Sequence, residues 1–147
     1  MATKGTWSSK NVSYQNLPKP QPWRTVWRDG FVPGLTTDEL LALRAACLSD
    51  DPRLVQGATT KPPPLMCVQD WPCEAGCAIG FSAMTTLGTV GEVEERFARL
   101  CFEADERLGE PAACRHFLNW FDNTPRADAL RELAIECELA LSDREAA

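Results

Sequence analysis

Apolar side chains recur at every third or fourth position over most of the chain after residue 35, which is the spacing of one face of an α-helix. The clearest example runs from Thr89 to Leu108, where Thr89 and Glu92 have the spacing of a capping box and Gly109 suits the position just after a helix. Its apolar stripe comprises Val90, Val93, Phe97, Leu100, Cys101, Ala104 and Leu108. This pattern predicts an amphipathic helix over residues 89–108.

Similar stripes and start signals predict the remaining helices. Thr36 and Glu39 repeat the capping-box spacing at the head of an apolar stripe over residues 36–49. Prolines that suit a first helical turn stand at positions 72, 111 and 125, which places further helices at about 70–84, 111–123 and 124–141. The expected fold class is therefore all-α, a small irregular bundle of four to five amphipathic helices.

The N-terminal part of the chain lacks these stripes. Residues 1–22 are polar with few aliphatic side chains, so little burial offsets their chain entropy and an extended conformation is expected. Residues 23–32 contain strand-forming aromatic side chains, and Asp29-Gly30 suits a tight turn, which favours a short β-hairpin there. We therefore divide the chain into an extended N-terminal arm, residues 1–34, and a helical domain, residues 35–147.

Charge divides the chain at nearly the same place. Residues 1–30 carry five cations and one carboxylate, a net charge of +4, whereas the other 117 residues carry ten cations and twenty carboxylates, a net charge of −10. A length of 147 residues suffices for one domain whose core needs no disulfide or metal. An acidic body repels phosphates, so only the basic arm has the charge required for direct contact with nucleic acid.

The sequence also predicts where the protein resides. No apolar run approaches the roughly 20 residues that cross a bilayer, and the segment MATKGTWSSK lacks the apolar core of a secretory signal. The seven cysteines are an odd number, which favours reduced thiols over a disulfide framework. We therefore expect a cytoplasmic protein without a membrane partner.

Cys67, Cys73 and Cys77 form a cluster of potential metal ligands. Zinc sites are usually built from pairs of cysteines two to four residues apart, but here one spacing is too long and the other has no matching second pair. Cysteine also behaves as a small hydrophobic residue, and the cysteines at positions 47, 101 and 137 fall on helix stripes. Core packing is the preferred interpretation, with metal binding or a reactive thiol as alternatives. No cofactor and no metal are expected.

The sequence contains no recognisable catalytic constellation. His116 is the only histidine, and Cys114, two positions earlier, would point away from it on a helix. The carboxylates of residues 92–106 alternate with arginines, as on a solvated helix face. Their i,i+4 pairs are Glu92–Arg96, Glu95–Arg99 and Glu103–Arg107. We predict no catalytic residues and no enzymatic activity.

The most distinctive residues lie in the basic arm, which combines aromatic side chains with cations. Tryptophan and arginine dominate protein-binding hot spots, and both also stack on nucleic-acid bases. The predicted partner-binding residues are Lys19, Trp23, Arg24, Trp27 and Arg28, with the tryptophans as anchors and the cations as steering charges. The alternative is that the arm folds back on the chain's own body, with the tryptophans capping the bundle and the cations facing acidic surface.

These observations predict a non-enzymatic interaction or adaptor protein, an acidic helical domain that docks on a larger protein assembly through its arm. Three alternatives stay open. In the first, the chain is an accessory subunit of a nucleoprotein complex, and its arm contacts nucleic-acid phosphates. In the second, its acidic body mimics nucleic acid and inhibits a nucleic-acid-binding protein. In the third, it is an enzyme or metal-binding protein that uses cysteines and His116. The sequence leaves the partner, the pathway and the oligomeric state open.

Overall fold

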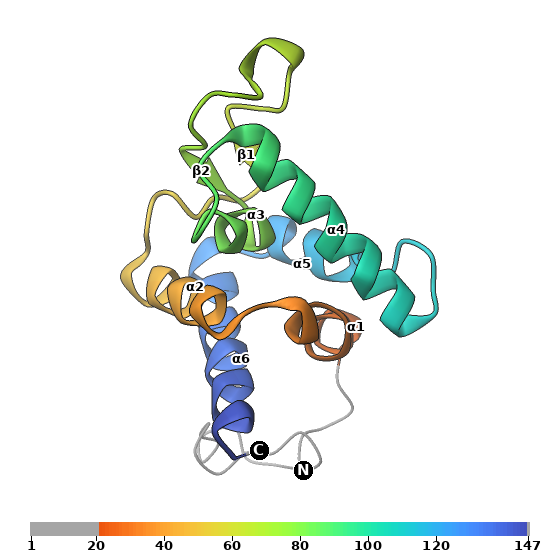
Figure 1. The fold of residues 1–147 in the computed structure, drawn as a ribbon. Coiled ribbons are helices and arrows are strands. Elements are labelled where there is room, and N and C mark those ends of the chain that lie inside the picture. Colours follow the sequence, from red (N-terminus) through yellow and green to blue (C-terminus); the bar gives the residue numbers. More distant parts are fainter. Residues whose placement is uncertain (1–20, 147) are drawn as a thin grey trace.

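The computed structural model describes residues 21–146, most of which are helical (Figure 1). The longer helices are α2 (Thr37–Ser49), α4 (Val90–Leu108), α5 (Arg115–Asn123) and α6 (Arg126–Ala146), and the short ones are α1 (Pro22–Thr25) and α3 (Ala78–Ala83). Strands β1 (Thr60–Lys61) and β2 (Ala75–Gly76) pair antiparallel in a two-stranded sheet. The expected mainly helical class is confirmed.

The β-hairpin expected over residues 23–32 is wrong, because this segment is helical. Helix α1 continues through a π-helical turn (Val26–Phe31) into a 3-10 turn (Val32–Gly34). The large apolar side chains of the segment stand at helical spacing, so a helix buries them on one face. The rest of the predicted extended arm, residues 1–20, lies outside the described residues.

Gly30 provides close packing rather than the expected hairpin turn. A Cβ at this position would lie 3.1 Å from the Cβ of Ala104 and 3.1 Å from a methyl group of Leu108, both on α4. A glycine here therefore lets the N-terminal helical segment approach α4 closely. The local sequence Asp29-Gly30 favours a tight turn, but packing against α4 stabilises a helix at this position instead.

Both predicted capping boxes are confirmed. Thr36 Oγ1 accepts a hydrogen bond from Glu39 N at 3.0 Å, and Glu39 Oε1 accepts one from Thr36 N at 2.8 Å. Thr89 and Glu92 make the equivalent pair at 3.2 and 3.1 Å. Each box satisfies two backbone N–H groups that would otherwise lack partners, which fixes where α2 and α4 begin. Gly109 ends α4 with a φ of 67°.

The helix expected over residues 70–84 forms only near its end, as α3. The preceding residues bond to other segments instead, because Glu74 N donates to Lys61 O at 2.8 Å and Gly76 N donates to Arg53 O at 2.9 Å. Cys77 then caps α3, with its Sγ accepting from Gly80 N at 3.4 Å. Pairing with a distant segment of the chain overrides the local start signal.

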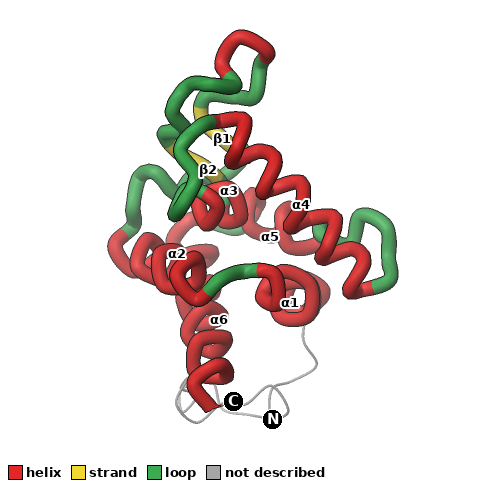
Figure 2. The backbone as a smooth tube through the Cα atoms, in the orientation of Figure 1, coloured by secondary structure: helices red, strands yellow, loops and turns green. Residues whose placement is uncertain are grey.

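The helices pack around one apolar core. Helix α2 packs on α6, the N-terminal helical segment lies against α4, and α3 packs on both α2 and α4 (Figure 1). The sheet lies beside the first turns of α4, and the loop of residues 61–74 extends beyond the start of this helix (Figure 2). We call residues 61–74 the 61–74 loop.

Aromatic rings fill the core between the N-terminal segment and α5. The rings of Trp23 and Trp120 stack with their centroids 3.6 Å apart and their planes 5° from parallel. Phe117 lies in the middle of the cluster, with its ring centroid 5.1 Å from that of Trp27 and 5.4 Å from that of Phe31. Such pairs contribute about 0.5–1.5 kcal/mol beyond the burial of their area. They connect the first described helix to a helix almost one hundred residues later.

We expect Gly80→Ala to lower the free energy of unfolding by about 2–3 kcal/mol, because the added methyl group overpacks a rigid contact. A Cβ on Gly80 would lie 2.2 Å from the backbone oxygen of Thr59. Gly88→Ala is the matched control, since a Cβ there meets nothing within 4 Å. Urea denaturation of both variants measures the difference. Equal stability of the two variants would contradict the close approach of α3 to Thr59.

Candidate functional site

The two tryptophans predicted as partner anchors lie in the core of the protein. Trp23 is 4% exposed and Trp27 is fully buried. Both rings contact the aromatic cluster of α5, and Trp23 Nε1 donates to Gln21 Oε1 at 2.9 Å. In this fold neither ring presents a free surface to a partner.

The two arginines of the predicted site contact carboxylates of α6. Arg28 makes a bidentate pair with Glu136, with Nε 2.9 Å from Oε1 and Nη2 2.7 Å from Oε2, and both residues are buried. Arg24 pairs with Glu132, and its Nε lies 3.4 Å from Glu136 Oε2. Bidentate pairs between arginine and carboxylate are among the stronger polar contacts in proteins.

Four of the five predicted residues therefore come together, but on the chain's own body. This arrangement corresponds to the alternative in which the arm folds back, with tryptophans against the bundle and cations against acidic residues. Lys19, the fifth, lies outside the described residues. The geometry gives these side chains a structural role: they attach the N-terminal helical segment to α5 and α6.

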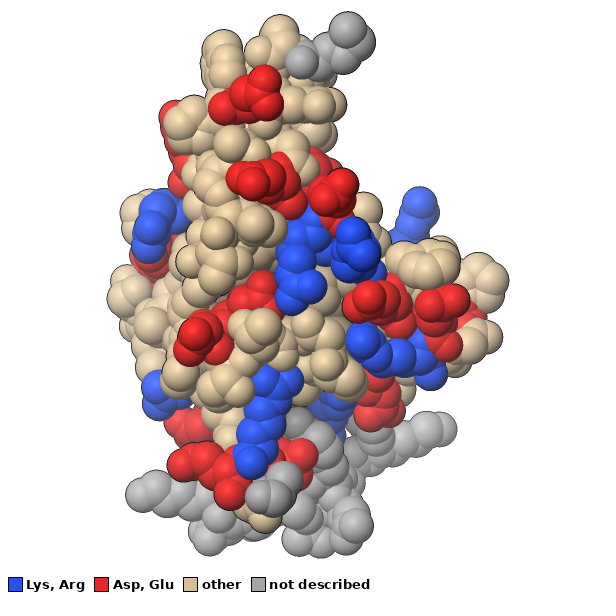
Figure 3. All heavy atoms as spheres, in the orientation of Figure 1, with Lys and Arg blue, Asp and Glu red and all other residues tan. Residues whose placement is uncertain are grey.

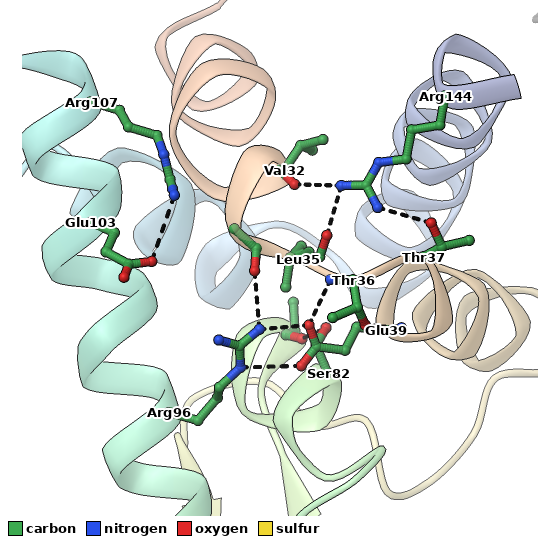
Figure 4. Close-up of polar contacts among 12 residues, drawn as sticks. Val32, Leu35, Thr36, Thr37, Glu39, Ser82, Arg96, Glu103, Arg107 and Arg144 are labelled. Atoms are coloured by element: carbon green, nitrogen blue, oxygen red, sulfur yellow. Dashed lines mark hydrogen bonds and ion pairs between the residues drawn. The ribbon is translucent and has the colours of Figure 1, made fainter. Parts of the chain in front are cut away.

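Three further arginines hold the end of the N-terminal segment, approaching it from α4 and α6 (Figure 4). They donate to backbone oxygens: Arg107 Nη1 to Gly30 at 2.7 Å, Arg96 Nη2 to Gly34 at 3.0 Å, and Arg144 Nη2 to Val32 at 2.8 Å and Leu35 at 2.6 Å. Carbonyl groups at the end of a helix lack intrahelical donors, and cations there complement the helix dipole. Nothing in the sequence pattern indicates these long-range contacts.

The expected ion pairs along α4 are formed only in part. Glu103 and Arg107 pair at 3.6 Å, as predicted. Arg96 instead pairs with Glu39 of α2 at 2.7 Å, because the carboxylate of Glu92 is used in the capping box. The hydrogen bonds to Thr89 hold the pKa of Glu92 below its usual value. The arginines of α4 therefore attach this helix to α2 and to the N-terminal segment, instead of pairing only along the helix.

The cysteines differ in exposure. Cys47, Cys77, Cys114 and Cys137 are buried, Cys73 and Cys101 are half-buried, and Cys67 is exposed. Burial raises the pKa of Cys47 to about 12 and that of Cys77 to about 11. Within residues 21–146, no group of three or more His, Cys, Asp or Glu side chains is placed to hold a metal ion. His116 is exposed on α5, with Nε2 3.6 Å from Glu110 Oε2.

We expect iodoacetamide at pH 8 to alkylate Cys67 well before the buried thiols of the folded protein. Only the thiolate reacts, and a pKa of about 11 leaves on the order of one in a thousand Cys77 thiols ionised at this pH. Peptide mass spectrometry after timed quenching measures the order of reaction, and the denatured protein serves as the control in which all seven thiols react. Alkylation of Cys77 as fast as Cys67 would show that the α3 region opens readily.

A groove of about 710 Å³ lies between α2 and α6. Its lining includes the apolar side chains of Cys47, Leu48, Leu130, Ala134 and Ile135. The charged side chains at its rim pair with one another, Arg44 with Glu138 at 3.0 Å and Arg126 with Asp50 at 2.7 Å. The groove therefore offers apolar area whose neighbouring charges are already engaged within the chain.

The 61–74 loop carries two large apolar side chains in water. Trp71 is 55% exposed and Leu65 is 60% exposed. Sequence reasoning did not select them, because a proline-rich loop without periodicity gives no information on which side chains the core covers. Exposed positions of a loop are usually polar, so two large apolar side chains in water distinguish this loop from an ordinary one.

Comparison of the chain with protein-family models, with curated proteins and with solved structures gives no match. None of the helices within residues 21–146 combines the length and the apolar composition that a membrane span requires.

Proposed function

We propose that the chain is a non-enzymatic interaction protein that docks on a larger protein assembly, and that it does so through the 61–74 loop. The observation that carries this proposal is the exposure of Trp71, a large aromatic residue that is 55% exposed to solvent. Tryptophan is enriched in binding hot spots because its burial at an interface removes much apolar area from water. Leu65, in the same loop, adds a second exposed apolar side chain.

Hydrogen bonds hold the backbone of Trp71 through both its N–H group and its carbonyl oxygen. Trp71 N donates to Val68 O at 3.0 Å, and Trp71 O accepts from Val90 N at 2.9 Å. Gly91 N also donates to Gln69 O at 2.9 Å, so the loop is attached to the start of α4. An anchor that is already positioned loses little conformational freedom on binding, which favours affinity.

This proposal places the docking surface away from the arm. Docking through Trp23 and Trp27 would require the N-terminal segment to leave the aromatic core. The nucleoprotein alternative requires arm cations at phosphates, and Arg24 and Arg28 are bound to carboxylates of α6. Binding a partner through the tryptophans and arginines of the arm would therefore require part of the fold to be disrupted. Trp71 is accessible in the folded protein.

The experiment that tests the proposal is photo-crosslinking from position 71 in the native cell. The full chain is expressed with benzoylphenylalanine in place of Trp71, and the matched control carries the same residue in place of Phe102, an exposed aromatic side chain on α4. We expect a protein adduct from position 71 that position 102 does not give. The captured protein is then purified for affinity measurements.

With the purified partner, Trp71→Ala is expected to weaken binding by about thirtyfold or more, the value for a hot-spot loss of about 2 kcal/mol. Phe102→Ala is expected to leave the dissociation constant unchanged. Absence of any adduct specific to position 71, or equal affinities of the two variants, would overturn the proposal. Competition by duplex DNA for the same partner would identify the chain as a nucleic-acid mimic.

A further inference from the structure

We infer that the partner of the 61–74 loop presents a basic surface with an apolar socket, so that carboxylates around Trp71 meet cations while Trp71 and Leu65 enter the socket. This inference rests on the proposed function and specifies the chemistry of the partner. It depends on the charges at this end of the molecule and on the backbone hydrogen bonds that attach the loop to the start of α4.

The surroundings of Trp71 are acidic. Residues 61–95, from the loop to the start of α4, carry one cation, Lys61, and five carboxylates, a net charge of −4. The next cation along α4, Arg96, is paired with Glu39 of α2. The carboxylates are Asp70, Glu74, Glu92, Glu94 and Glu95. This end of the molecule shows acidic and uncharged surface, without Lys or Arg, on the face drawn in Figure 3.

Hydrogen bonds bring the two acidic segments together. Pro72 and Thr89 are bridge partners, and Val90 N donates to the oxygen of Trp71. Thr60, at the base of the loop, donates through Oγ1 to Glu94 Oε2 at 3.3 Å. These contacts place the loop beside the start of α4, so the carboxylates of both segments lie at the same end of the molecule as Trp71.

Several carboxylates elsewhere among the described residues form ion pairs within the chain. Glu39, Glu132 and Glu136 pair with arginines of the chain itself, which neutralises them locally. The carboxylates of Asp70, Glu74 and Glu95 are exposed, and within residues 21–146 they form no ion pair with an arginine or lysine. Unpaired charges at the rim of an apolar patch set the sign of the partner and accelerate its approach, more than they contribute to affinity.

The occupant we infer is thus a basic protein surface. A neutral partner would bury the apolar side chains but would leave the surrounding carboxylates to lose hydration without compensation. An acidic partner or a nucleic acid would be repelled. Complementary charge with a central aromatic anchor is the usual arrangement of a specific interface.

The test uses a phage-displayed library of random dodecapeptides selected on the full chain, so it does not depend on the native partner. Selection on the wild-type protein is followed by removal of peptides that also bind Trp71→Ala. We expect the remaining peptides to be enriched in Lys and Arg together with apolar residues. The strongest peptide is synthesised with a fluorescent label, and its binding is measured by polarisation.

Charge variants complete the test. The triple variant Asp70→Asn, Glu74→Gln and Glu95→Gln is expected to slow association of this peptide about tenfold, with a smaller loss of affinity, and to reduce the dependence of binding on salt. The matched control removes three exposed carboxylates far from the loop, with the changes Glu106→Gln, Asp143→Asn and Glu145→Gln. The control is expected to bind as the wild type does.

Each outcome decides between the two proposals. Selected peptides without net positive charge, or equal binding by the triple variant and its control, would overturn the inference of a basic partner and leave docking through Trp71 intact. A library that yields no peptide dependent on Trp71 would also overturn the inference. Failure of the crosslink from position 71 in the cell is a separate result and would overturn the proposed function itself.

Discussion

Trp27→Ala is expected to lower the free energy of unfolding by about 3–5 kcal/mol, the cost of removing a fully buried tryptophan from a packed core. Its ring is 0% exposed and lies 5.1 Å, centroid to centroid, from the ring of Phe117. The loss would separate the N-terminal helical segment from α5. Urea denaturation followed by circular dichroism gives the free energy and its change.

Two comparisons make this prediction specific. Trp71→Ala changes the same residue type at a half-exposed position and is expected to cost less than about 1 kcal/mol. Trp27→Phe keeps an aromatic ring and removes an indole N–H that is buried without a hydrogen-bond partner, a state that costs about 1–3 kcal/mol. It should therefore be milder than Trp27→Ala. A loss below about 1 kcal/mol for Trp27→Ala would show that the segment is not part of the core.

The helices that could be predicted from the sequence are those whose signals are local. The capping boxes at Thr36 and Thr89 and the glycine at position 109 act within one turn of the helix they start or end, and all three work as expected. Local hydrogen bonds of this kind depend little on the rest of the fold. That is why α2 begins, and α4 begins and ends, near the predicted positions.

The N-terminal segment could not be predicted because its structure depends on distant residues. Trp23, Val26, Trp27 and Phe31 have helical spacing, but a turn signal at Asp29-Gly30 competes with it locally. Contact of Gly30 with Ala104 of α4 and pairing of Arg28 with Glu136 settle the competition. These partners are 74 or more positions away along the chain.

The candidate docking site could not be predicted for the same reason. A tryptophan in an aperiodic loop has no pattern that separates a core residue from an exposed one, and position 71 became a candidate only when its exposure was known. The charged surroundings were partly visible in the sequence, as carboxylates at the start of α4. Their proximity to Trp71 depends on the bonds from Gly91 to Gln69 and from Val90 to Trp71.

Glu136→Ala is expected to lower the free energy of unfolding by about 3–5 kcal/mol, because it leaves the guanidinium of Arg28 buried without its carboxylate. Glu132→Ala is the matched control on the same helix. Its carboxylate is partly exposed, so the loss there should stay below about 1 kcal/mol. Replacing both buried partners, as Arg28→Met with Glu136→Leu, should recover most of the stability, because no charge then remains in the core.

The same three variants decide how firmly the arm belongs to the body. If Glu136→Ala unfolds at the same urea concentration as Glu132→Ala, the pair of Arg28 and Glu136 contributes little to the attachment of the N-terminal segment to α6. The attachment would then depend on the aromatic contacts with α5, which the Trp27 variants measure. If Glu136→Ala is strongly destabilised and the double variant recovers, the segment is a structural part of the core. Trp71 then remains the accessible anchor through which the protein would bind.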